Sequence, residues 1–84
     1  MAEGWLRCNI VKGMFSDELA IVYTFKQQGK EESFFVPKDQ VVGAVDSQGK
    51  VKVRVFRQGD TSWVVLPTDD QAEIPVDDAD LISA

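Results

Sequence analysis

Short apolar segments alternate along the chain with clusters of glycine, proline and small polar residues. Leu6, Cys8 and Ile10 alternate with Arg7 and Asn9, a period of two that is typical of a strand with one buried face. Later segments are rich in β-branched and aromatic residues, which favour strands. The pattern predicts strands at residues 6–11, 20–25, 33–36, 41–45, 51–57, 62–66 and 72–74.

Turn residues separate these segments. Gln27-Gln28-Gly29-Lys30 predicts a hairpin between the second and third strands. Asp46-Ser47-Gln48-Gly49 predicts another hairpin, in which Gly49 takes a positive φ. A helix over residues 16–20 is the alternative for that stretch, because Ser16 could cap it. Residues 21–25 favour a strand, so we expect no helix there.

The two halves of the chain resemble each other. LRCNIVKG parallels VKVRVFRQG, and in each half an apolar strand then ends near a proline, Pro37 or Pro75, where we expect one turn of 3₁₀ helix. This indicates a repeat spanning residues 5–42 and 50–82, although regular strands in any short β protein would also align with themselves. We predict one all-β domain over residues 1–84: a small, antiparallel, partly open barrel of five to seven short strands, with a three-strand unit that duplication would explain.

The end of the chain resembles an SH3-like small barrel. The resemblance rests on Ser62-Trp63-Val64-Val65-Leu66, a polar turn, Ala72-Glu73-Ile74-Pro75, a predicted helical turn at 76–79 and a return at Leu81-Ile82. It implies the barrel, not a particular family. Peptide-binding SH3 domains present aromatic residues to proline-rich ligands, whereas here only Trp63 stands near such a position and Ala79 replaces the expected tyrosine.

Length and composition limit the classes of protein that fit. A chain of 84 residues, 44% hydrophobic and 27% charged, provides one hydrophobic core and matches globular proteins. Its single cysteine, Cys8, cannot form an internal disulfide, and we recognise no targeting segment. The longest apolar runs fall far below the ~20 residues of a membrane-spanning helix. We therefore expect a cytoplasmic protein without membrane insertion.

Charge is divided unevenly along the chain. Residues 1–57 carry nine basic and seven acidic residues, whereas residues 58–84 carry seven acidic residues and no basic one, which gives a net charge of −5. Such an acidic surface repels nucleic acid phosphates and favours a partner with a basic surface, or cations. We predict a monomer or a weak homodimer, since an unpaired strand edge could join two copies.

Catalytic chemistry has little support. The chain lacks histidine, the commonest general base near neutral pH, and its serines lack a neighbouring base. Cys8 shares the face of Leu6 and Ile10, which indicates a buried structural thiol. We expect no enzyme and no cofactor. Acidic residues near the C-terminus are weak candidates for a cation site, but a solvated acidic face explains them better; they are Asp69, Asp70, Glu73, Asp77, Asp78 and Asp80.

Binding is the function class that remains. We predict a non-catalytic module that docks onto a larger protein or complex through exposed large apolar residues, namely Trp5, Met14, Phe15 and Trp63. The alternative for Met14 and Phe15 is that they fold back and plug one end of the barrel, which the sequence favours slightly. A second hypothesis is single-stranded nucleic acid binding by one face of the strand at 51–57, formed by Lys50, Lys52, Arg54 and Phe56. A small-ligand or cation-binding protein is the third.

Overall fold

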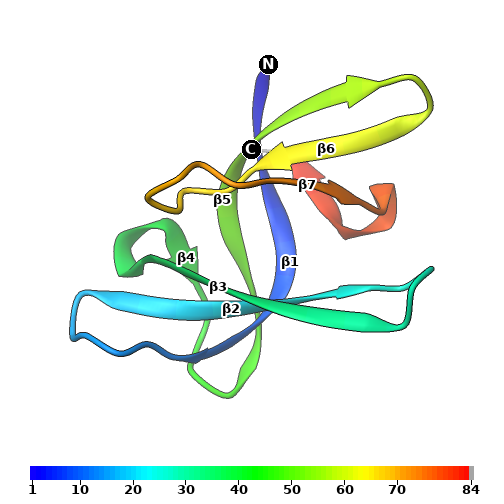
Figure 1. Cartoon of the computed structure of the whole chain (residues 1–84). Helices are drawn as coiled ribbons and strands as arrows, with labels where there is room; N and C mark the ends of the chain where they lie inside the picture. Colours follow the sequence, from blue (N-terminus) through cyan, green and yellow to red (C-terminus); the bar gives the residue numbers. More distant parts are fainter. Residues whose placement is uncertain (84) are drawn as a thin grey trace.

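The computed structural model describes residues 1–83 and is all-β (Figure 1). Eight strands and two one-turn 3₁₀ helices follow one another along the chain. The first half contains β1 (Ala2–Lys12), β2 (Glu18–Phe25), β3 (Lys30–Pro37), η1 (Lys38–Gln40) and β4 (Val41–Val42). The second half contains β5 (Ser47–Gln58), β6 (Thr61–Val65), β7 (Glu73–Val76), η2 (Asp78–Asp80) and β8 (Leu81–Ser83). Residues 16–20 form no helix; they make a turn and the start of β2.

All strand pairs are antiparallel, and they form one curled sheet that closes about half of a barrel. The strand order is β3-β2-β1-β5-β6-β7, with β4 beside β5 and β8 beside β1. The long strands β1 and β5 run through the middle of the sheet, and the β2–β3 and β6–β7 hairpins cross them at opposite ends (Figure 1). β3 and β7 end this order without a further paired strand in residues 1–83, so the predicted small, antiparallel, partly open barrel is confirmed. It has eight strands in these residues instead of the five to seven short ones predicted, because β8 adds a three-residue strand beside β1, and β1 and β5 are 11 and 12 residues long.

The strand pairing of the two halves matches. In each half a long strand, two further strands, a 3₁₀ turn and a short strand follow in the same order, and the short strand pairs with the long strand of the other half. Leu6 and Val51 are partners in the central β1–β5 pair. Pro37 immediately precedes η1, whereas Asp77 immediately precedes η2. Pro75 lies two residues earlier, inside β7, so the two prolines do not occupy equivalent positions. Duplication as the origin of this pattern stays a prediction.

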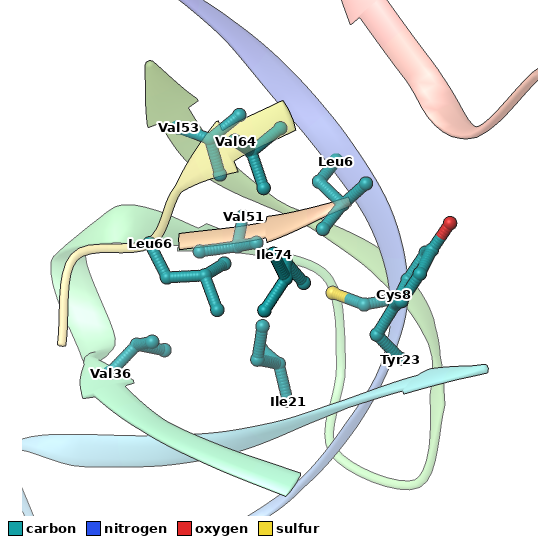
Figure 2. Close-up of a cluster of buried hydrophobic side chains, with 10 residues drawn as sticks. All are labelled: Leu6, Cys8, Ile21, Tyr23, Val36, Val51, Val53, Val64, Leu66 and Ile74. Atoms are coloured by element: carbon teal, nitrogen blue, oxygen red, sulfur yellow. The ribbon is translucent and has the colours of Figure 1, made fainter. Parts of the chain in front are cut away.

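The hydrophobic core lies on the inner face of the curled sheet. Figure 2 shows buried side chains from six strands that converge on one another, together with Leu66 just after β6. Leu6 and Ile10 on β1 and Ile21 on β2 are fully buried, as the period-two pattern predicts. Burying such a side chain stabilises the fold by about 1.5 to 3 kcal/mol.

The hairpin around residue 46 differs from the prediction. β4 covers only Val41–Val42, and β5 already begins at Ser47. Positive φ angles occur at Gly43 (135°) and Asp46 (65°), not at Gly49, which pairs with Cys8 inside the sheet. Gly49 is needed for space, since a Cβ there would overlap Ile10 Cδ1 and the Val42 carbonyl oxygen.

No helix within residues 1–83 is long and apolar enough to cross a membrane.

Candidate functional site

The β1–β2 loop presents two large apolar side chains to solvent. Met14 is 75% exposed and Phe15 is 68% exposed, so they do not plug the end of the barrel. Hydrogen bonds fix the loop that carries them: the Met14 N–H donates to Glu18 Oε1 over 3.2 Å, and the Glu18 N–H donates to the Phe15 carbonyl over 3.3 Å. A further bond, from the Lys38 N–H to the Asp17 carbonyl over 3.0 Å, ties the loop to η1. The backbone of the loop is therefore held while its two apolar side chains stay free.

Phe35 is a further exposed apolar side chain, on β3. It pairs with Ala20, which pairs in turn with Val11, so the three residues form a row on the outer face of β1, β2 and β3. Phe35 is 47% exposed. We call Met14 and Phe15 the apolar loop patch. The sequence prediction missed Phe35, although adjacent phenylalanines on one strand must point to opposite faces.

The four residues of the nucleic acid hypothesis lie on one face of β5. Lys50, Lys52, Arg54 and Phe56 alternate there with Val51 and Val53, which are buried on the other face, and Val55. Two residues of β1 adjoin them, because Trp5 pairs with Lys52 and Arg7 pairs with Lys50. The sequence prediction missed Arg7, whose position beside this row depends on the register between two strands far apart in the chain.

Two aromatic groups lie on this same outer face. The Lys50 ammonium lies 4.6 Å from the ring centroid of Trp5, within the range of a cation–π contact. Phe56 pairs with Trp63 on β6, and their rings stack with centroids 6.2 Å apart and planes inclined by 16°. Trp5, Phe56 and Trp63 are all partly exposed. We call these three residues, with Arg7, Lys50, Lys52 and Arg54, the basic aromatic face.

The residues predicted to bind a partner therefore divide between two surfaces. Met14 and Phe15 belong to the apolar loop patch, whereas Trp5 and Trp63 belong to the basic aromatic face. Trp5 lies near the start of β1 and Trp63 lies on β6, whereas Met14 and Phe15 follow the far end of β1. The structure does not bring the four residues together into one site.

The acidic residues around η2 are occupied by contacts within the protein. The Tyr23 hydroxyl donates to Asp80 Oδ2 over 2.8 Å and accepts from the Asp77 N–H over 3.0 Å. Lys26 Nζ lies 3.1 Å from Asp80 Oδ1. Asp77 Oδ1 also accepts from the Ala79 N–H, which caps η2. These contacts line one side of a cavity of about 310 Å³ between the end of β2 and η2, and they join the two halves of the chain.

Asp78 has two partners of its own. It accepts hydrogen bonds from the Ser62 hydroxyl and from Arg57, and these bonds hold its pKa below the usual value for an aspartate. Asp70 accepts from the Thr68 hydroxyl, and Asp69 and Glu73 lie on the exposed surface. No group of three or more histidine, cysteine, aspartate or glutamate side chains within residues 1–83 is arranged to hold a metal ion.

Two buried groups hold their protons at neutral pH. Burial raises the pKa of the Cys8 thiol from 9.0 to about 12, so the nucleophilic thiolate is not formed. Burial is also the main cause that raises the pKa of Tyr23 to about 12. The sequence prediction missed Tyr23, whose signal is its place in phase with Ile21, because a buried tyrosine hydroxyl needs a partner.

The described surfaces thus offer binding through apolar contact on one side and through cations and aromatic rings on another. No protein-family model, curated protein or solved structure matches the chain.

Proposed function

We propose that this protein is a non-catalytic interaction module that docks onto a partner protein through the apolar loop patch. The observation that carries the proposal is the exposure of Met14 and Phe15 on a loop whose backbone is held by hydrogen bonds. A large apolar side chain is costly to leave in water, and a loop whose backbone is already held loses little backbone freedom when that side chain is buried in a pocket.

The surroundings of the patch define the chemistry of the partner. Asp17 and Glu18 follow Phe15 after Ser16, and Asp17 is exposed. The partner that fits is a protein with an apolar pocket whose rim carries basic side chains, because such a rim complements these carboxylates. Fully burying a phenylalanine or methionine side chain provides about 1.5 to 3 kcal/mol, so the two anchors together contribute about 3 to 6 kcal/mol to the contact.

The proposal is tested by comparing capture by the wild-type protein and by the Met14→Ala, Phe15→Ala double variant from nuclease-treated source lysate. The matched control is the double variant Val42→Ala, Val45→Ala, which also removes exposed apolar area (52% and 45% exposed) but from β4 and the loop after it. We expect a discrete protein that the wild type and the control retain and that the loop variant loses. With the purified partner, calorimetry should show an affinity at least about tenfold weaker for the loop variant, which equals about 1.4 kcal/mol.

Two further measurements make the test decisive. Asp17→Lys should weaken the same interaction, since it places a positive charge against a basic rim. Equal capture by the loop variant and the control would contradict the proposal. Sedimentation of the wild type alone should show a monomer, and self-association that the loop variant abolishes would assign the patch to a homodimer instead of a partner protein.

A further inference from the structure

We infer that the basic aromatic face binds a segment of single-stranded nucleic acid. This surface is separate from the apolar loop patch, and the inference does not depend on the proposed docking function. Three features of the outer face of β1, β5 and β6 support it: the arrangement of its charges, the aromatic rings interleaved with them, and a hollow beside the cations.

Positive charge is concentrated on this face although the whole chain is acidic. Lys50, Lys52 and Arg54 occupy every second position of β5, about 6.6 Å apart, and Arg7 lies across from Lys50. Two acidic residues share the face. Glu3 lies 3.8 Å from Lys52 in an exposed ion pair, and Glu73 is on β7, beyond Val65.

A second group of acidic residues lies away from this face. Asp60, Asp77 and Asp78 line the cavity at the end of β2, and Asp80 adjoins it through Tyr23. Charges farther apart than about 8 Å are largely screened at physiological salt. On the strands, the outer face of β5 therefore offers four cations against Glu3 and Glu73. Asp69 and Asp70 are exposed in the loop between Thr68 and Gln71, at the border of the hollow beside Arg54.

Aromatic rings indicate which anion this face suits. Trp5 adjoins the middle of the cationic row, and the stacked pair of Phe56 and Trp63 continues the row at the end of β5. Rings placed beside cations match a chain that alternates phosphates with flat bases, since bases stack on aromatic side chains while phosphates contact lysine and arginine. A duplex keeps its base faces covered, so single strands are the form that fits.

A hollow beside the cations provides room for part of the strand. On the side of β5 that faces away from β1, β4 pairs with residues up to Val51 and β6 pairs with residues from Arg54 onward. Lys52 and Val53 therefore have no strand partner on that side. A cavity of about 310 Å³ opens there. It is lined by Lys52, Arg54 and Gln71, among others, and Arg54 Nη2 donates to Gln71 Oε1 over 3.3 Å.

The inference is tested by fluorescence anisotropy with labelled twelve-nucleotide oligo-dT and oligo-U at 50 and 200 mM salt. Three to four phosphate contacts predict that log K falls with log salt with a slope of about −2 to −3. Lys50→Glu with Lys52→Glu should weaken binding at least about tenfold at 50 mM salt and lower the slope by about 1.4, since each lost contact accounts for about 0.7. The matched control is Lys30→Glu with Lys38→Glu, which changes the net charge equally but on β3 and η1, and it should stay within about twofold of the wild type.

Three results would overturn the inference. The first is that the wild type does not bind at 100 μM protein in 50 mM salt, a concentration on the order of the weakest non-specific dissociation constants. The second is an equal loss of oligonucleotide affinity in both double variants. The third is that poly-glutamate competes for the protein as strongly as oligo-dT does. The last result would assign the face to acidic proteins. Circular dichroism confirms that each variant is folded, and Lys52→Gln with Arg54→Gln serves as a milder pair should the charge reversal unfold the domain. Met14→Ala with Phe15→Ala should leave oligonucleotide binding unchanged, which separates this test from that of the docking function.

Discussion

Replacing Tyr23 by phenylalanine removes one hydroxyl that joins the two halves of the chain. The ring is 3% exposed and its phenolic oxygen points out of the core cluster in Figure 2, towards the segment that carries Asp77 and Asp80. The variant loses a hydrogen bond to a charged acceptor, worth about 1.5 to 3 kcal/mol, and one from a backbone N–H, worth about 0.5 to 1.5 kcal/mol. Because Asp80 keeps its contact with Lys26, we expect a loss of about 2 to 3 kcal/mol in the free energy of unfolding.

Urea denaturation followed by tryptophan fluorescence measures this loss. With a slope of about 1 kcal/mol per molar urea for a small domain, the midpoint should fall by about 2 to 3 M, and the melting temperature by at least about 8 °C. The matched control is Thr24→Val, which removes the neighbouring hydroxyl and its exposed 3.4 Å contact with Glu31. The control should change stability by less than about 0.5 kcal/mol.

A double-mutant cycle with Asp80→Ala isolates the contact between the two side chains. The sum of the stability losses in the two single variants should exceed the loss in the double variant by about 1 kcal/mol or more, since each single variant removes the same hydrogen bond. The reasoning is refuted if Tyr23→Phe is as stable as Thr24→Val, or if the losses in the cycle simply add.

Two other predictions concern stability. Gly49→Ala should destabilise by about 3 kcal/mol in urea denaturation because its Cβ overlaps Ile10, whereas Gly59→Ala should lose only about 1 kcal/mol, since its φ of +62° is strained but its surroundings are open. In alkaline solution, the raised pKa values of Cys8 and Tyr23, both about 12, mean that the folded state keeps protons that the unfolded state has lost. Stability should therefore be full below about pH 9 and fall as the pH rises towards 12, and Cys8→Ala should delay the onset to about pH 10.

Clear outcomes contradict each of these. A greater loss for Gly59→Ala than for Gly49→Ala would show that backbone strain outweighs the close approach of the strands. Urea midpoints of the wild type that stay constant from pH 8 to pH 11 would show that neither buried group keeps its proton.

Local periodicity accounts for what could be predicted of the surfaces. A strand sends alternate side chains to opposite faces whatever its neighbours are. Leu6 and Ile10 were therefore predictable as buried residues, and Lys50, Lys52 and Arg54 as residues that share a face. The same property would have revealed Phe35, because its neighbour Phe34 occupies the opposite face of β3.

The β1–β2 loop shows where local patterns end. Its composition left two conformations for Met14 and Phe15, and the sequence slightly favoured the one in which they plug the barrel. Hydrogen bonds from Met14 to Glu18 and from Lys38 to Asp17 decide the outcome, and the second depends on where η1 lies in the folded chain. Gly49 is similar, because its role depends on how closely Ile10 approaches from another strand.

By itself the sequence determined the all-β class, the antiparallel hairpins and the inner and outer faces of the main strands, because these follow from interactions between residues near each other in the chain. Only the tertiary structure decided which strands become neighbours. It placed Trp5 beside Lys50 and joined Tyr23 to Asp80, 57 residues away. Such contacts depend on the register and curvature of the whole sheet, which no local pattern encodes.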